Sequence, residues 1–111
     1  MDSINPHKAV NAIFKTGKLY AHAKSCRVYI EQYRKSKKAM LIQEAPKGTM
    51  LEKESFAYSH PEYLELLEGL REAVESEEKY KYELKAAELR VETWRTMQAN
   101  MRKELNASNM T

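Results

Sequence analysis

Apolar residues recur at alternating separations of three and four along the second half of the chain. The series is Tyr63, Leu66, Leu70, Ala73, Glu77, Tyr80, Leu84, Ala87, Val91, Trp94, Gln98 and Met101. This alternation is the heptad seam with which one helix packs along another. It predicts a long helix over residues 60–104. The residues expected to hold its seam together are Leu66, Leu70, Tyr80, Leu84, Val91 and Trp94.

The first half of the chain carries a comparable pattern, which predicts a helix over residues 6–41. The predicted seam is Ala9, Ala12, Thr16, Leu19, Ala23, Cys26, Ile30, Tyr33, Lys37 and Met40. Small residues let two helix axes approach closely, and further large apolar residues flank this seam. A pair of helices cannot bury so wide a surface, so we expect self-association into a dimeric helical bundle.

Proline, glycine and capping residues mark where the helices should begin and end. Ser3 or Asn5 can cap the first helix just before Pro6. Pro46 and Gly48 should end that helix and turn the chain.

Two further signals divide the remainder of the chain. Thr49 and Glu52 form a capping-box pattern, which predicts a short helix within the connector 42–59. Ser59 should cap the second long helix, with Pro61 in its first turn. We expect that helix to end at about Glu104, with a frayed tail over residues 105–111.

These elements predict an all-α fold in a single domain, residues 1–111. Its architecture would be a long antiparallel helical hairpin resembling a coiled coil, with a short connecting helix. Charged residues make up 32% of the chain, with only three glycines and three prolines, a composition that favours helices over strands. The single Cys26 cannot form an internal disulfide, and no apolar run is long enough to span a membrane. We therefore expect a cytoplasmic protein that does not insert in membranes.

The charges are distributed unevenly along the chain. Residues 1–41 carry a net charge of +7, residues 61–78 carry −6, and residues 79–104 carry +3. Antiparallel packing would place the acidic block beside the basic end of the first helix and leave the open end of the hairpin positive. The candidate residues there for binding nucleic acid or a partner are Lys8, Lys15, Lys18, Arg90, Arg95, Arg102 and Lys103. The alternative is that these bases only form a solvated face.

The sequence contains no pattern typical of catalysis, of a metal site or of a cofactor or small-molecule site. His7, His22 and His60 are scattered, and Cys26 has no second cysteine with which to share a metal. Cys26 is expected to be a small core residue. Glu77 lies on the predicted seam, where a polar residue typically fixes register or specifies a partner.

Trp94, the only tryptophan, admits two interpretations. Its place on the seam favours packing against another helix, whereas the nearby Arg90 and Arg95 suit an aromatic platform for a nucleobase or a protein pocket.

The segments "GTMLEKESFAYS" and "YLELLEGLREAVESEEKYKYELKAAELRVETWRTMQANMR" resemble small helical proteins of tailed bacteriophages and prophages, encoded among early recombination and replication genes. That resemblance supplies no catalytic or binding residue to transfer, but it implies a role in phage DNA metabolism or host takeover. We therefore expect a non-enzymatic accessory protein of DNA recombination or replication that contacts nucleic acid or an enzyme acting on it. The alternative is an inhibitor or adaptor that binds a host or defence protein through a helical face.

Overall fold

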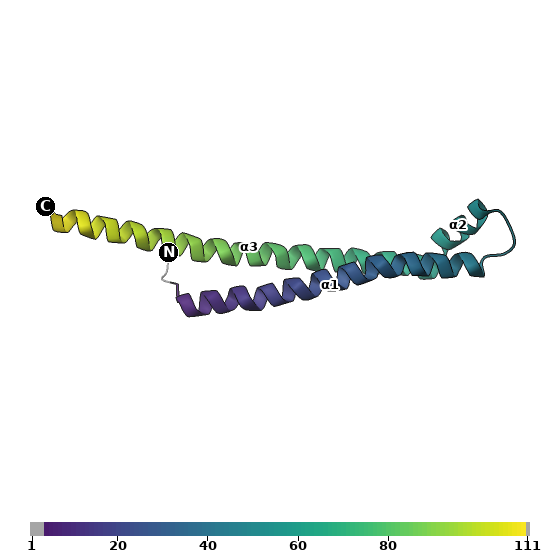
Figure 1. Ribbon diagram of the computed structural model, residues 1–111, viewed down its shortest axis with the longest axis horizontal. Helices are drawn as coiled ribbons and strands as arrows, with labels where there is room; N and C mark the ends of the chain where they lie inside the picture. The colour runs from purple at the N-terminus through teal and green to yellow at the C-terminus, as the bar shows by residue number, and fades with distance from the viewer. Residues whose placement is uncertain (1–3, 111) are drawn as a thin grey trace. The chain divides into compact units, whose positions relative to one another are not determined.

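The computed structural model describes residues 4–110, and these form three α-helices without any strand. The helices are α1 (Pro6–Glu44), α2 (Met50–Ser59) and α3 (Pro61–Met110), as Figure 1 shows. The expected all-α class, with two long helices packed antiparallel and a short helix between them, is confirmed.

The chain divides into two compact units. Unit 1 comprises Met1–Tyr20 with Tyr80–Thr111, and unit 2 comprises Ala21–Lys79. Each unit contains a part of α1 running antiparallel to a part of α3, which can be followed by the residue colours of Figure 1.

The start of α1 follows the capping chemistry expected from its sequence. The side-chain Oδ1 of Asn5 accepts hydrogen bonds from the backbone N–H groups of His7 and Lys8, at 3.0 and 3.2 Å. These bonds satisfy two of the amide groups that a helix leaves without partners in its first turn. Asn5 is therefore the cap, and the other candidate, Ser3, lies outside the described residues.

The short helix α2 is also capped as predicted. Thr49 accepts a hydrogen bond from the backbone N–H of Glu52 through its Oγ1, at 3.2 Å. The carboxylate of Glu52 lies directly over Gly48, in space that a Cβ atom at Gly48 would occupy. The turn between α1 and α2 therefore uses a glycine for close approach.

The predicted cap of α3 is wrong by one residue. Ser59 is the last residue of α2, and its hydroxyl donates to the carbonyl oxygen of Ser55 at 2.7 Å. His60 takes the capping position instead, because its Nδ1 accepts from the backbone N–H of Glu62 at 3.1 Å. The hydroxyl of a serine in the last turn of a helix readily bonds to the carbonyl four residues earlier, and this removes it from the competition to cap α3.

The predicted end of α3 is also wrong. The helix continues past Glu104 to Met110, through the residues that were expected to fray. Neither proline nor glycine occurs in this segment to stop a helix.

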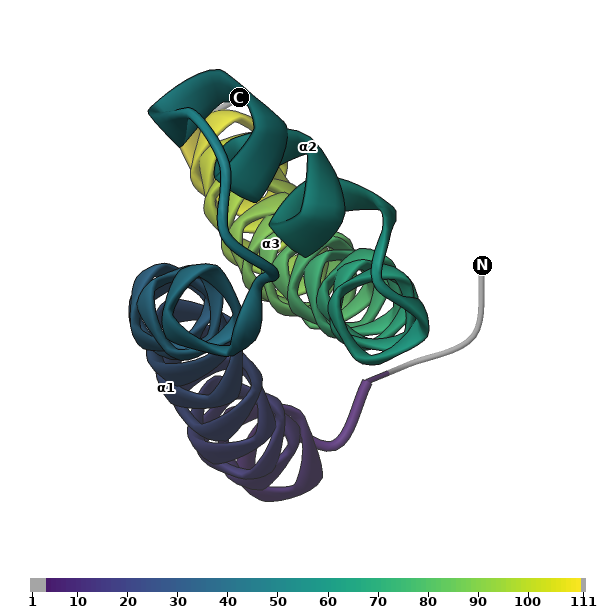
Figure 2. The same cartoon turned by 90° about the vertical axis from the view of Figure 1, so that its right-hand side faces the viewer.

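The core of unit 2 joins all three helices. Leu41 of α1, Ala57 of α2 and Tyr63 of α3 are buried together, with Ile42 and Leu67 packed against them. Figure 2 looks onto this end of unit 2, where the ends of the three helices meet. α2 therefore closes the end of the helix pair.

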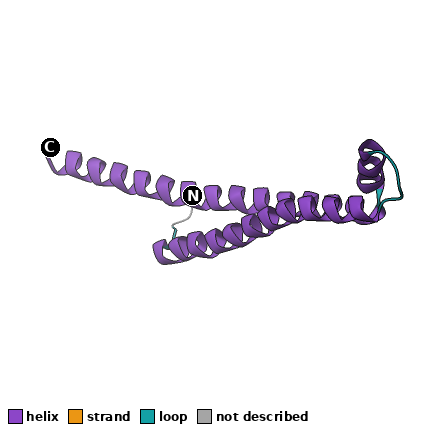
Figure 3. Cartoon of the chain, turned by 45° about the vertical axis from the view of Figure 1, so that its right-hand side comes forward, coloured by secondary structure: helices purple, strands orange, loops and turns teal. Residues whose placement is uncertain are grey.

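The α3 seam is the series predicted from Tyr63 onward. Every position from Tyr63 to Trp94 in that series is buried or half-buried, whereas Gln98 and Met101 are exposed. In unit 1, α3 continues beyond the first turn of α1, as Figures 1 and 3 show. The last positions of the predicted seam therefore have no helix of this chain to cover them.

The seam predicted for α1 is wrong in every second position. The heptad series in which every residue is buried or half-buried is Ala9, Ile13, Thr16, Tyr20, Ala23, Arg27, Ile30, Arg34, Lys37 and Leu41. The residues expected at the alternate positions, one residue earlier, are all exposed: Ala12, Leu19, Cys26, Tyr33 and Met40. The predicted and the observed series both have the heptad spacing. Only the observed series places Leu41 in the core and Arg27 beside α3. Cys26 is consequently a surface residue.

The two units differ in how well they are packed. All five buried residues of the described chain, Ala23, Leu41, Ala57, Tyr63 and Glu77, belong to unit 2. Within residues 4–20 and 80–109, which represent unit 1, the facing positions of the two helices are only half-buried. Unit 1 therefore leaves much of its apolar surface in contact with solvent.

Candidate functional site

The seven basic residues singled out in the sequence all belong to unit 1. Three come from α1 and four from α3, and all are exposed: Lys8, Lys15, Lys18, Arg90, Arg95, Arg102 and Lys103. None of them has an ion-pair partner among residues 4–110. Their charges are therefore available to a ligand.

The sequences of the two units differ in net charge. Unit 1 contains nine basic and five acidic residues, a net charge of +4, whereas unit 2 contains ten basic and eleven acidic residues, a net charge of −1. The positive charge of the chain is thus concentrated in unit 1. A concentration of bases of this kind attracts anionic ligands.

Several bases of unit 2 are paired with acids. The Arg27 guanidinium binds Glu77 through Nε at 2.6 Å and Glu31 through Nη1 at 2.9 Å, and these hydrogen bonds raise the pKa of Arg27. Lys37 Nζ lies 2.6 Å from Glu62 Oε2, a hydrogen bond that raises the pKa of the amine and lowers that of the carboxyl. Unit 2 therefore uses charge to hold α1 and α3 together.

Helical rotation groups four of the seven bases into two pairs. Lys8 and Lys15 are seven residues apart on α1, as are Arg95 and Arg102 on α3. Seven residues correspond to nearly two full turns, so the members of each pair project from the same side of their helix. Arg90 lies five residues before Arg95, which places it on a different side of α3. The seven bases therefore do not form one patch.

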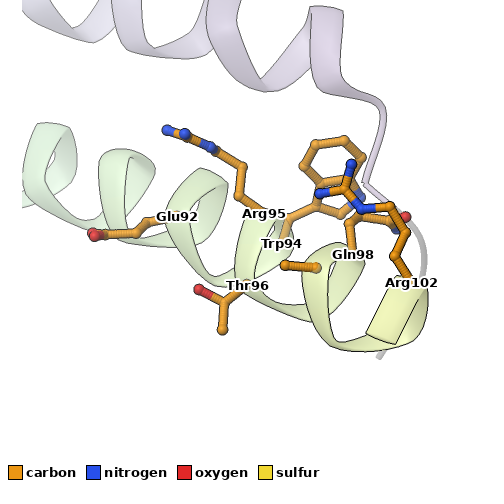
Figure 4. A pocket seen from close by; sticks show the side chains of 7 residues that line it. Glu92, Trp94, Arg95, Thr96, Gln98 and Arg102 are labelled. Atoms are coloured by element: carbon orange, nitrogen blue, oxygen red, sulfur yellow. The ribbon is translucent and has the colours of Figure 1, made fainter. Parts of the chain in front are cut away.

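Arg95 and Arg102 line a shallow hollow of about 590 Å³ on α3. In Figure 4 the side chains of Trp94, Arg95, Gln98 and Arg102 extend toward the α1 ribbon, whereas Thr96 extends from the opposite side of α3. Glu92 also lines the hollow and is its one acidic group. The hollow therefore combines two guanidinium groups, an amide and an indole.

Trp94 is half-buried. Its position on the α3 seam gives it a packing role, while its place in the hollow leaves part of the indole accessible. The two interpretations of Trp94 are thus compatible within one side chain. The other residues named for the predicted seam, Leu66, Leu70, Tyr80, Leu84 and Val91, are half-buried as well.

The sequence alone did not identify the partner of Glu77. Glu77 is buried, with 8% of its surface exposed, and accepts two hydrogen bonds from Arg27 across the helix pair. The sequence of α1 does contain a signal for this partner. Two series of α1 residues fit the heptad spacing, and Arg27 belongs to one of them. Charged residues seldom occupy core positions, so the sequence favours Cys26 on the seam, whereas in the structure Cys26 is exposed.

Lys38 and Tyr58 form a further contact between α1 and α2. The Lys38 amine lies 4.7 Å from the centre of the Tyr58 ring, and a hydrogen bond to Tyr58 raises the pKa of the lysine. This contact stabilises the closed end of unit 2.

The histidines and the cysteine do not assemble a metal site within residues 4–110. His22 Nε2 and Cys26 Sγ lie 3.7 Å apart on the exposed surface of α1, without a third ligand beside them among those residues. None of the three helices, over the part of the chain described, has an apolar stretch long enough to cross a membrane.

Comparison with known proteins finds no matching family model, no similar curated protein and no similar solved structure.

Proposed function

We propose that this chain is a non-enzymatic accessory protein that binds nucleic acid through unit 1. The observation that carries the proposal is the concentration in that unit of seven exposed bases without an ion-pair partner among residues 4–110. Phosphate groups are the natural ligands of such a surface, because each neutralised phosphate releases condensed counterions. In keeping with the resemblance of the sequence, the process served is DNA recombination or replication in a bacteriophage or prophage.

The hollow beside Trp94 supports single-stranded nucleic acid as the ligand. Arg95 and Arg102 offer planar guanidinium groups, which form paired hydrogen bonds with phosphate oxygens. The exposed part of Trp94 offers a surface on which a base can stack, and such stacking tolerates any base. A base in a duplex is already stacked on its neighbours and is less available for this contact.

The proposal is tested by fluorescence anisotropy with labelled single-stranded and double-stranded oligonucleotides of equal length. Binding should be tighter for the single strand and should weaken steeply with salt. Absence of binding to either oligonucleotide, even at about 50 mM salt, would exclude nucleic acid as the direct ligand.

A second function is favoured by the apolar residues of the same unit. Phe14, Leu89, Met101 and Leu105 are large apolar residues that remain exposed. Exposed apolar surface of this kind marks a site for an oligomer or another partner. The alternative function is therefore inhibition or recruitment of a host or defence protein through a helical face.

A pull-down from bacterial lysate, with and without nuclease treatment, separates the two functions. A protein retained after nuclease treatment favours the inhibitor or adaptor, whereas loss of all retained proteins favours nucleic-acid binding. In either case we propose that the active form is a dimer, because the facing positions of unit 1 are only half-buried within one chain.

A further inference from the structure

α1 carries an uncovered apolar face in unit 1. Val10, Phe14 and Gly17 are separated by four and three residues, so helical rotation places them within roughly 60° of one another. Phe14 is 66% exposed and Val10 is 43% exposed. By the same rotation, the seam residue Ile13 lies about 40° from Gly17 but about 100° from Phe14, and Thr16 lies about 160° from Phe14. The face therefore borders the surface that meets α3 on its Gly17 side, while Phe14 and Val10 turn away from that surface.

Gly17 is one of two helical glycines, together with Gly69, at which no neighbouring group of this chain requires a glycine. A Cβ atom at Gly17 would meet no other atom within 4 Å. A glycine inside a helix costs about 1 kcal/mol relative to alanine. Gly17 is half-buried, and its missing side chain leaves a gap at the edge of the α1 seam, three residues from the exposed Phe14.

The exposed area of the chain is sufficient for a further helix contact. The accessible surface is 8901 Å² for a chain of 13.0 kDa. A compact monomer of that mass exposes about 6,300 Å². The difference between these two accessible areas is similar to the roughly 1,000–2,500 Å² that each subunit of an obligate dimer buries. Unit 1, whose facing positions are half-buried, is the part that gains most from such burial.

We infer that the occupant of this face is the α1 helix of a second copy, packed antiparallel so that Phe14 of each copy covers Gly17 of the other. This inference rests on the dimer proposed above and specifies its contact surface. In a two-fold symmetric pair, placing residue 14 opposite residue 17 of the second copy places residue 17 opposite residue 14 at the same time. A large side chain then fills the gap left by a small one on both sides of the axis.

Charge gives this contact a distinct salt dependence. Lys18 borders the face, and Lys8 and Lys15 lie on the same part of α1. Pairing two α1 helices brings these like charges closer, so screening by salt should strengthen the dimer. Phosphate binding by the same unit should weaken with salt. The two properties can therefore be separated in one salt series.

The test is sedimentation velocity on the full chain at micromolar concentration, with circular dichroism to verify helix content. Two variants act on the face: Phe14→Ala removes the covering ring, and Gly17→Leu fills the gap. Two matched controls lie elsewhere. Leu19→Ala truncates a residue that is 43% exposed, as Val10 is, on the opposite side of α1. Gly69→Leu fills the other helical glycine that has open space around it.

We expect the wild-type chain and both controls to sediment as dimers, and both face variants to associate more weakly by about tenfold or more with helix content retained. Dimers of undiminished strength in Phe14→Ala and Gly17→Leu would overturn this contact surface while leaving the proposed dimer intact. A monomeric wild-type chain would overturn the dimer and the contact together. Neither result changes the oligonucleotide measurement, which tests nucleic-acid binding separately.

Discussion

Arg27 of α1 and Glu77 of α3 face each other across unit 2 and form a two-point ion pair. Arg27 Nε donates to Glu77 Oε2 at 2.6 Å, and Nη2 donates to Oε1 at 3.0 Å. Both residues occupy seam positions, one on each helix. A planar guanidinium matches a carboxylate in this geometry only at one register of the two helices. The pair therefore fixes how α1 and α3 align in unit 2.

The first prediction concerns this alignment. Arg27→Gln and Glu77→Gln should each lower the melting temperature. The first removes both hydrogen bonds from the guanidinium to the buried carboxylate of Glu77, and the second leaves Arg27 paired with Glu31 alone. The double variant should cost less than the sum of the two single variants. Thermal unfolding followed by circular dichroism measures all four proteins, and strictly additive losses would show that the two residues do not act as a pair.

The second prediction concerns pH and the pair Lys37–Glu62. The hydrogen bond from Lys37 lowers the pKa of Glu62 below its ordinary 4.5, and the same bond raises the pKa of Lys37 above its ordinary 10.5. A lowered carboxyl pKa stabilises the fold above pH 4.5 and ceases to do so as pH falls through the folded value. A raised amine pKa stabilises the fold below pH 10.5 and is lost as pH rises through the folded value.

The difference in melting temperature between the wild-type chain and Lys37→Gln should therefore be largest between pH 4.5 and pH 10.5. It should shrink at pH 3. Lys35→Gln, an exposed lysine without an ion-pair partner among the described residues, is the control. A difference that is the same at pH 3 and pH 7 would show that the pair does not contribute through its charge.

The third prediction concerns the core of unit 2. Leu41 is fully buried between α2 and α3, so Leu41→Ala should lower the free energy of unfolding by about 2–5 kcal/mol. Leu51→Ala changes an exposed residue of α2 and should alter stability by no more than about 0.5 kcal/mol. Urea denaturation compares the two. Equal effects would mean that α2 does not pack on α1 and α3 as described.

The fourth prediction concerns Gly69, in the interior of α3. Because a Cβ atom there would meet nothing within 4 Å, Gly69→Ala should stabilise the chain by about 0.5–1 kcal/mol through helix propensity. Gly48→Ala should give no such gain, since its Cβ would displace the Glu52 carboxylate. A loss of stability in Gly69→Ala would indicate that another molecule, such as a second copy, approaches α3 at that point.

Much of the fold could be predicted from the sequence because its signals are local. The caps at Asn5 and Thr49 depend on residues three positions away or fewer, and the α3 seam is apolar on only one side. α1 has two apolar series one residue apart, and Leu19 and Met40 are as apolar as Ile13 and Leu41. Only contact with α3 determines which of the two series is buried, and the buried series includes Arg27.

The candidate site was predictable in part for the same reason. The seven bases are visible in the sequence, and their placement in one unit follows from the antiparallel fold. The hollow beside Trp94 depends on how the side chains of α3 are arranged around the indole, and no sequence motif marks that arrangement. Gly17 likewise shows its significance only once the space around it is known to be open.

The most direct test of nucleic-acid binding through unit 1 is the salt dependence of single-stranded oligonucleotide affinity in two charge-matched double variants. Arg95→Gln with Arg102→Gln alters the hollow, whereas Lys35→Gln with Lys47→Gln removes the same charge from unit 2. Each lost phosphate contact should reduce the slope of log affinity against log salt by about 0.7. We predict a shallower slope and weaker binding for the first variant alone. Equal slopes and affinities for the two variants would contradict a site in unit 1.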